Sequence, residues 1–255
     1  MLILTIGDII GSPGRRAVDK LVPALRQEYG IDFVIANAEN SAGGFGVTPE
    51  TAQELFDADI DVLTSGNHIW AQKDIFPYLD SEMPILRPLN YPPGVPGRGY
   101  LIKDGVLVVN LIGRTFIGSF DCPFQAMDKL LSELKPRPPI IIVDFHAEAT
   151  SEKMAMGRYL DGRVSATVGT HTHVGTIDAR VLPQGSAYVT DLGMVGPIDS
   201  IIGDDTEAVM QRFLTAMPHR LTVGHGKTML NAVLIKVDDK TGKALSIERI
   251  YREVG

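Results

Sequence analysis

The chain has 255 residues, of which 44% are hydrophobic and 22% charged, and its formal net charge is −7. A chain of this length can bury a full hydrophobic core, which excludes a peptide or a disulfide-stapled mini-protein. The acidic balance, without any basic run, argues against binding to duplex nucleic acid, and no apolar stretch reaches the ~18 residues of a membrane span.

The first half of the chain predicts short buried strands that alternate with helices. Leu2–Gly7 is an apolar run before a glycine-rich turn, which predicts a strand, and Arg15–Tyr29 carries apolar residues at helical spacing before Gly30. Short buried strands between helices imply parallel crossover connections. The other elements expected here are strands at Asp32–Ala36, Ile60–Thr64 and Ile140–Val143, and helices starting near Thr48 and over Trp70–Leu79.

Antiparallel strands are expected to join this pattern. Tyr100–Leu111 contains two β-rich segments around Asp104-Gly105, which is the composition of a two-residue hairpin turn, and the Pro- and Gly-rich segment Pro84–Gly99 predicts a long irregular loop. The second half predicts a strand at Val164–Val168, a hairpin around Gln184-Gly185, a helix over Asp204–Ala216, and strands at Met229–Val237 and Ala244–Tyr251. We therefore expect a single α/β domain over residues 1–255, built as a layered α/β/α sandwich with mixed sheets.

Polar residues with metal-binding side chains gather just after the predicted strands. Ligands bind at the carboxyl ends of strands in open α/β sheets, so these residues are expected to converge at one edge. Each alone has an ordinary structural interpretation, as a helix cap, a turn residue or a hydrogen-bonded histidine. Their number favours a metal site. The residues are Asp8, Glu39, Asn40, Asn67, His68, His146, His171 and His173.

The donor types restrict the metal. The only cysteine, Cys122, stands outside the group, which excludes a structural zinc site of the cysteine type. Carboxylate, amide oxygen and imidazole together suit manganese, iron or zinc. The donors are too numerous for one ion, and a shared carboxylate can bridge two ions at the ~3.5–4 Å separation of two-metal hydrolases.

These residues lie in motifs that resemble a known superfamily. Gly66-Asn67-His68, the lone His146 and Gly169-Thr170-His171-Thr172-His173 resemble, in chain order, the blocks of the calcineurin-like metallophosphoesterases. The segments that look like the bacterial 2',3'-cyclic-nucleotide 2'-phosphodiesterase subfamily are Gly7-Asp8-Ile9-Ile10-Gly11, Asn37-Ala38-Glu39-Asn40, Asp144-Phe145-His146-Ala147-Glu148 and Asp191-Leu192-Gly193-Met194. The resemblance covers nearly the whole chain and implies a four-layer α/β/β/α sandwich with mixed parallel and antiparallel sheets.

The resemblance also implies a role for each residue. One metal would be held by Asp8, Glu39, Asn40 and His173, and the other by Glu39, Asn67, His146 and His171. Glu39 would bridge the two ions, and His68 would be the general acid, with orientation of substrate or of a ligand as its alternative role. Two departures from the superfamily stand out, because Ile10 replaces a histidine and Glu39 replaces the usual bridging aspartate. Iron is the metal favoured by the subfamily likeness, followed by manganese, with zinc also open.

The implied activity is hydrolysis of small phosphodiesters, with 2',3'-cyclic nucleotides converted to 3'-nucleotides by a hydroxide that bridges the metals. The bound cations would attract a phosphate despite the acidic net charge. A broad-specificity phosphomonoesterase and a non-catalytic, metal-dependent phosphoester-binding regulator remain alternatives. The expected partner is a small anionic phosphoester or nucleotide, with a homo-oligomer left open and no membrane partner. The lone cysteine and the lack of a signal sequence favour a cytoplasmic location.

Several weaker signals leave their roles open. The turn Gly7–Gly14 has the wrong spacing for a dinucleotide-binding loop, so we interpret it as a turn that presents Asp8, with Arg15 and Arg16 solvated. The sequence does not decide whether substrate is contacted by Phe45, Arg114, His225 or Lys227.

Overall fold

The computed structural model describes residues 1–255 and contains two six-stranded mixed sheets. The first sheet has the order β12-β11-β10-β1-β2-β3 and consists of β1 (Leu2–Ile9), β2 (Phe33–Asn37), β3 (Val62–Thr64), β10 (Met194–Pro197), β11 (Thr228–Val237) and β12 (Ala244–Val254). The second has the order β4-β5-β6-β7-β9-β8 and consists of β4 (Tyr100–Lys103), β5 (Val106–Ile112), β6 (Ile140–His146), β7 (Ala166–Thr170), β8 (Arg180–Val181) and β9 (Ala187–Val189).

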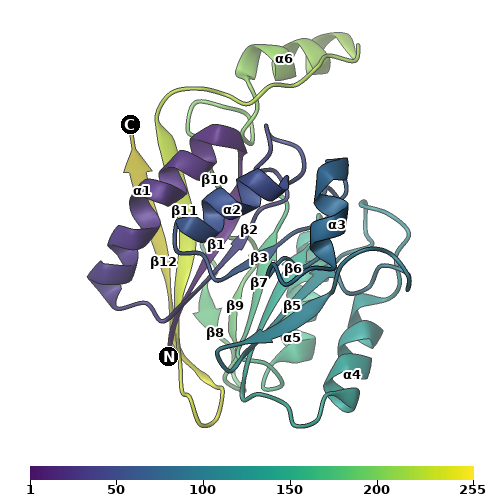
Figure 1. Ribbon diagram of the computed structural model, residues 1–255, viewed down its shortest axis with the longest axis vertical. Coiled ribbons are helices and arrows are strands. Elements are labelled where there is room, and N and C mark those ends of the chain that lie inside the picture. The colour runs from purple at the N-terminus through teal and green to yellow at the C-terminus, as the bar shows by residue number, and fades with distance from the viewer.

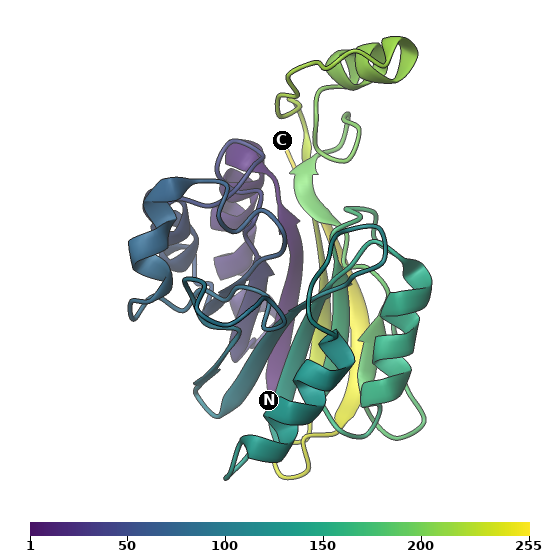
Figure 2. The same cartoon turned by 90° about the vertical axis from the view of Figure 1, so that its right-hand side faces the viewer.

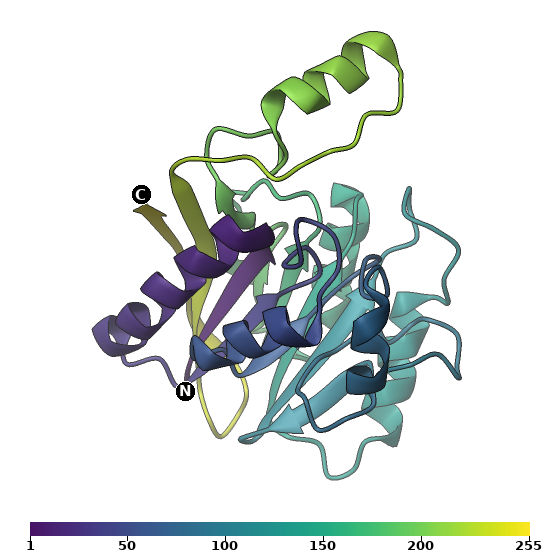
Figure 3. The same cartoon turned by 45° about the horizontal axis from the view of Figure 1, so that its top comes forward.

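The helices cover the outer faces of the two sheets (Figures 1 and 2). The helices are α1 (Gly11–Tyr29), α2 (Pro49–Asp57), α3 (Phe76–Leu79), α4 (Pro123–Glu133), α5 (Thr150–Leu160) and α6 (Thr206–Thr215), with a 3-10 turn at Lys73–Ile75. In Figure 2, α1 and α2 lie on one side of the paired sheets, and α4 and α5 lie on the other. Helix α6 stands apart from the sheets in all three ribbon views, and Val209 is its only buried residue (Figure 3).

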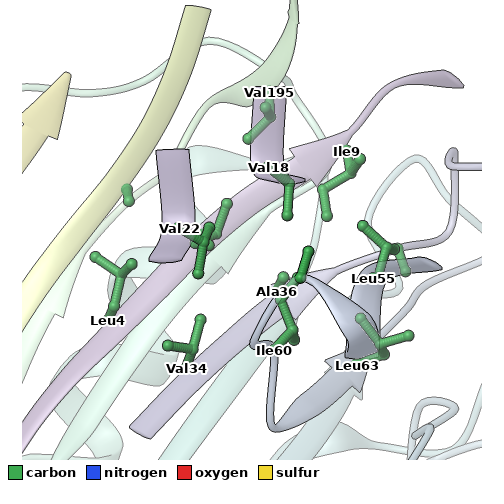
Figure 4. Packing of buried hydrophobic residues seen from close by; sticks show 14 of the residues in the cluster. Leu4, Ile9, Val18, Val22, Val34, Ala36, Leu55, Ile60, Leu63 and Val195 are labelled. Carbon is green, nitrogen blue, oxygen red and sulfur yellow. The ribbon is translucent and has the colours of Figure 1, made fainter. Parts of the chain in front are cut away.

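Three hydrophobic clusters separate four layers. The period-2 alternation of β1 and β2 sends Leu4 and Val34 toward α1 and α2, as Figure 4 shows, whereas Ile3 and Phe33 belong to the cluster between the sheets. In β6, likewise, Ile142 belongs to the cluster between the sheets, and its neighbours face α4 and α5. The α/β/β/α architecture implied by the resemblance is therefore confirmed.

The three-layer interpretation drawn from the residues alone is corrected to four layers. A strand that is apolar on both faces can be covered by helices or by a second sheet, and periodicity alone does not distinguish the two. The polar residues that follow the strands are consequently divided between two sheets rather than placed along the edge of one.

Most of the predicted elements are present. The hairpin at Asp104-Gly105 is confirmed, because Lys103 pairs with Val106 and both turn residues have positive φ, as a two-residue turn of this type requires. The hairpin near Gln184-Gly185 joins β8 to β9, and the segment 84–99 forms no helix or strand, only isolated bridges. No helix of the structure combines the length and apolar character needed to cross a bilayer.

The helix expected over Trp70–Leu79 is wrong in extent. The structure has a 3-10 turn followed by the single-turn helix α3, which begins at Phe76. Pro77 lacks an amide hydrogen and is best tolerated in the first turn of a helix, which is its place in α3. The sequence-based prediction also left out α4, α5 and β10.

We expect the cluster between the sheets to contribute substantially to stability. Phe33 is 1% exposed there, so Phe33→Ala should lower the free energy of unfolding by about 3–5 kcal/mol, through lost burial and an unfilled cavity. Phe213 on α6 is 77% exposed, so Phe213→Ala should change the free energy of unfolding by no more than about 0.5 kcal/mol. Urea denaturation of both variants measures the difference, and equal midpoints would contradict the assignment of Phe33 to a tightly packed core.

Candidate metal centre

The predicted site residues lie where the carboxyl ends of parallel strands from both sheets meet. Asp8 is in β1, Glu39 and Asn40 follow β2, and Asn67 and His68 follow β3, all in the first sheet. The second sheet contributes three histidines from the ends of β6 and β7, namely His146, His171 and His173. Direct contacts link these residues into one group with two sets of donors.

One set of donors crowds around a single ring nitrogen. Nε2 of His146 lies 3.0 Å from Oε1 of Glu39, 3.0 Å from Nδ1 of His171 and 3.1 Å from Oδ1 of Asn67. Glu39, His146 and His171 thus offer three ligand atoms within 4.8 Å of one another. His146 and Glu39 are almost completely buried, so water does not separate their charges.

The second set lies around Asp8. Nε2 of His173 is 3.7 Å from Oδ1 of Asp8 and 3.2 Å from Nδ2 of Asn40. The two sets are joined at the backbone, because the amide of His171 donates to Oδ2 of Asp8 at 3.2 Å. Oδ1 of Asp8 is buried and accepts no hydrogen bond.

The electrostatic field at these atoms favours positive charge. Burial alone would lower the pKa of His146, but Glu39 and Asp8 raise it to about 9. Burial alone would raise the pKa of Glu39, but the charge of His146 and its hydrogen bond lower it to about 2. Burial raises the pKa of Asp8 to about 6, although His173 and His146 act in the opposite direction. The buried carboxylates of Glu39 and Asp8 thus favour positive charge at His146.

A metal ion fits these residues. One N–H of His146 cannot donate to Glu39, Asn67 and His171 together, although all three lie within 3.1 Å of it. A buried carboxylate oxygen without a partner, as on Asp8, is costly unless a cation or donor reaches it. Carboxylate, amide oxygen and imidazole are ligands that transition metals accept.

Behind His146 lies a buried polar network that the sequence-based prediction did not include. Oγ1 of Thr170 lies 3.0 Å from Nδ1 of His146 and donates to Oδ1 of Asp144 at 2.7 Å, and Thr64 donates to Oδ2 of the same carboxylate at 2.5 Å. Asn37 lies within 3.4 Å of both Asp144 and His146. Such contacts to the far ring nitrogen fix the orientation of a ligating histidine. The only sequence signal for them was that Asn37, Asp144 and Thr170 lie in the quoted motifs.

The ring of His68 lies beside the two sets of donor atoms rather than among them. Its backbone amide donates to Oε2 of Glu39 at 3.0 Å, and its ring stands 4.3 Å from the ring of Phe45, measured between centroids. Burial, together with the charges of His146 and His173, lowers its pKa against the attraction of Glu39. Phe45 is 53% exposed, so one face of the site carries an exposed aromatic ring.

Other residues singled out in the sequence lie outside the donor group. Lys227 pairs with Glu253, and His225 is exposed. Arg114 lies in the loop that follows β5, and its backbone amide donates to the carboxylate of Glu152 on α5. The interpretation of Arg15 as solvated is wrong, because Nη1 donates at 2.5 Å to the carbonyl of Ser41, the residue after Asn40.

One further carboxylate contacts the site. Oε2 of Glu148 lies 3.0 Å from Nε2 of His171, on the side of the ring opposite His146. Its side chain is 49% exposed, so Glu148 stands at the rim of the site. Glu148 belongs to the motif around His146, but its sequence position alone gave no reason to assign it a contact.

Comparisons with known proteins agree with this architecture. The sequence profile of the YmdB-like protein family matches residues 4–250. The chain is 50% identical over 254 residues to the 2',3'-cyclic-nucleotide 2'-phosphodiesterase of Bacillus subtilis (strain 168), covering 98% of this chain and 96% of that protein.

Two solved structures share the whole fold. A hypothetical protein from Thermus thermophilus superposes with a TM-score of 0.93 at 44% identity, covering 99% of both chains. A novel phosphatase from Mycoplasma pneumoniae superposes with a TM-score of 0.92 at 33% identity, covering 99% of this chain and 93% of that one. The resemblance read from the motifs is thereby confirmed, and the chain belongs to the YmdB-like protein family.

Proposed function

We propose that this protein hydrolyses small phosphodiesters and converts 2',3'-cyclic nucleotides to 3'-nucleotides with the help of two transition-metal ions. The observation that carries the proposal is the crowding of Glu39, Asn67 and His171 around Nε2 of His146. Hydrolysis of a phosphoester is supported by the 50% identical relative, which is named a 2',3'-cyclic-nucleotide 2'-phosphodiesterase.

The two sets of donors would hold the two ions. Asp8, Asn40 and His173 would bind one ion, Asn67, His146 and His171 the other, and Glu39 would contribute to both. When bound, the metal ions supply positive charge for the phosphate and lower the pKa of water. Iron is proposed first and manganese second, with zinc also compatible with the donor types.

His68 would protonate the departing 2'-oxygen of the nucleotide. The contact of its amide with Glu39 and the packing of its ring against Phe45 restrict where the imidazole can point. Burial lowers the pKa of His68 in the free protein, and an incoming phosphate anion favours its protonated form. A histidine that binds the proton together with the anion has the proton available when the P–O2' bond breaks.

The position of Phe45 favours a nucleotide substrate over a phosphoester that has no base. Its ring is exposed and lies directly beside His68. If His68 protonates the 2'-oxygen of the ribose, the base on that ribose would be within reach of Phe45. The side-chain amide of Gln72, through Nε2, donates to the carbonyl of Phe45 at 2.8 Å, which restrains the loop. An aromatic ring held in this way offers a stacking surface to any base.

Glu39→Gln should release metal and abolish hydrolysis, because a neutral amide cannot serve as a carboxylate bridge. Elemental analysis should find close to two transition-metal ions per wild-type chain and clearly fewer in the variant. Hydrolysis of 2',3'-cyclic AMP should fall to background in the variant. Wild-type activity in Glu39→Gln, or in protein stripped of metal by a chelator, would refute the metal-dependent mechanism.

His68→Ala should keep both metals and lower kcat for 2',3'-cyclic AMP by about 10²–10⁴-fold, the usual contribution of a general acid. His219→Ala is the matched control, since His219 is exposed and lies beyond α6. The two variants are compared by steady-state kinetics and elemental analysis. Unchanged turnover in His68→Ala would eliminate the acid role while leaving the metal site intact.

Phe45→Ala should raise KM for 2',3'-cyclic AMP by about 5- to 150-fold with little change in kcat, because stacking of one base contributes about 1–3 kcal/mol. Phe45→Trp keeps an aromatic surface and should behave like the wild type. Glycerol 1,2-cyclic phosphate, which has no base, should be hydrolysed equally well by all three proteins. An equal rise in KM for both substrates in Phe45→Ala would show that Phe45 shapes the site without stacking on the base.

A further inference from the structure

A buried ion pair lies behind the loop that carries His171 and His173. Nζ of Lys153 on α5 is 2.6 Å from Oδ2 of Asp191, which follows β9, and the two residues are 2% and 0% exposed. Neither residue belongs to the proposed metal ligands. Lysine is rarely buried so completely unless its charge is paired, so this pair calls for a specific explanation.

The carboxylate of Asp191 holds the backbone between the two histidines. Oδ2 of Asp191 accepts from the hydroxyl of Thr172 at 2.7 Å and from the amide of Thr172 at 3.2 Å. Its other oxygen, Oδ1, accepts from the amide of Gly193 at 2.8 Å. Thr172 is the single residue between His171 and His173, so Asp191 fixes the point from which both imidazoles are directed.

Lys153 can reach Asp191 because Gly169, in the strand that its side chain crosses, has no side chain. A Cβ added at Gly169 in β7 would lie 3.0 Å from Cδ of Lys153 and 1.8 Å from the carbonyl oxygen of Thr190. The lysine stem therefore runs across β7, two residues before His171. Any larger residue at position 169 would displace both the stem and the neighbouring strand.

The backbone of the loop is strained and needs such support. His171 has φ of 99° and His173 has φ of 65°, values that residues with a side chain rarely adopt. These conformations persist because each neighbouring group is tied down. The amide of His171 contacts Asp8, Thr172 contacts Asp191, and Nδ1 of His173 lies 2.7 Å from the carbonyl of Ile202.

The first sheet secures Asp191 from the opposite side. Arg249 of β12 donates to the carbonyl of Asp191 at 3.1 Å, to that of Leu192 at 2.5 Å and to that of Thr176 at 2.9 Å. Asp191 is thus fixed through its backbone by Arg249 and through its side chain by Lys153.

We propose that Lys153 and Asp191 are positioning residues that hold Thr172 so that His171 and His173 each face their own set of donors, and that they thereby set the metal affinity. This role rests on the proposed function in taking the two histidines as metal ligands. Contacts of this kind, one step behind the ligands, typically change metal affinity by about 10–100-fold.

A purely structural role predicts a different result. Replacing a buried ion pair with apolar residues of similar volume is often neutral or stabilising, whereas removing one partner leaves a buried charge unpaired. The double variant Lys153→Met/Asp191→Leu leaves no buried charge unpaired and should therefore fold, with a lower melting temperature because the donors of Thr172 and Gly193 lose their acceptor. Its Mn²⁺ affinity then measures positioning, and its melting temperature measures stability.

The test is Mn²⁺ binding to chelator-stripped protein, measured by titration calorimetry well below the melting temperature. The double variant should bind Mn²⁺ about 10–100-fold more weakly than the wild type. Leu160→Ala is the matched control, because Leu160 is fully buried on the same helix as Lys153 but belongs to the hydrophobic cluster behind the second sheet. It should lower the melting temperature and leave Mn²⁺ affinity unchanged.

A second pair of variants addresses the hydroxyl directly. Thr172→Ser keeps the donor to Asp191 and should retain wild-type Mn²⁺ affinity, whereas the isosteric Thr172→Val should weaken it several-fold. Amide hydrogen exchange, followed by mass spectrometry on peptides that contain Thr172, gives a readout that needs no metal. Exchange should be faster in the double variant and unchanged in Leu160→Ala.

The outcomes separate this inference from the proposed function. Unchanged Mn²⁺ affinity in the double variant, or a loss matched by Leu160→Ala, would overturn the positioning role. Absence of Mn²⁺ binding in the wild type would count against the proposed metal centre instead. In that case hydrogen exchange alone decides whether the pair holds the loop, and unchanged exchange in the double variant would refute it.

Discussion

The site depends on one constraint: donor atoms from two different sheets converge on a place where the carboxylates of Asp8 and Glu39 are buried. Glu39 comes from the first sheet and His146 from the second, yet their polar atoms lie 3.0 Å apart. Asp8 adds a carboxylate oxygen without a hydrogen-bond partner. Burying such groups is unfavourable unless positive charge joins them. The hydrophobic contact between the sheets must therefore stabilise an arrangement that the site itself opposes in the absence of a cation.

The polar groups behind the donors explain how this arrangement is kept. Asp144 is buried and receives hydrogen bonds from Thr64 of the first sheet and Thr170 of the second. It therefore links the two sheets next to His146, where hydrophobic contacts alone would leave the ring free to turn. Lys153 and Asp191 occupy the corresponding position behind the other two histidines. In both places a buried carboxylate is fully hydrogen-bonded, which is the condition under which buried polar networks add specificity.

The residues of the site could be predicted from the sequence to the extent that each follows an apolar run. Asp8, Asn67 and His146 stand where a buried strand ends, and strand ends in α/β sheets share an edge. The division of these strands between two sheets was not visible, because Ile3 and Leu4 are equally apolar although they face different layers. Lys153 was also invisible, since a lysine in a polar segment normally lies in solvent. Its burial follows from the bare surface of Gly169, a contact between distant segments that no local pattern encodes.

Only one residue separates the two histidines, yet they face different donors. In an extended strand, residues two apart project to the same face, so a regular strand would direct His171 and His173 to one place. The structure instead directs His171 toward His146 and His173 toward Asp8. Left-handed backbone at both residues makes this division, at a cost that Thr172 and its hydrogen bonds to Asp191 must offset. A tight pair of histidines can thus serve two neighbouring sets of donors only where the backbone between them is held from behind.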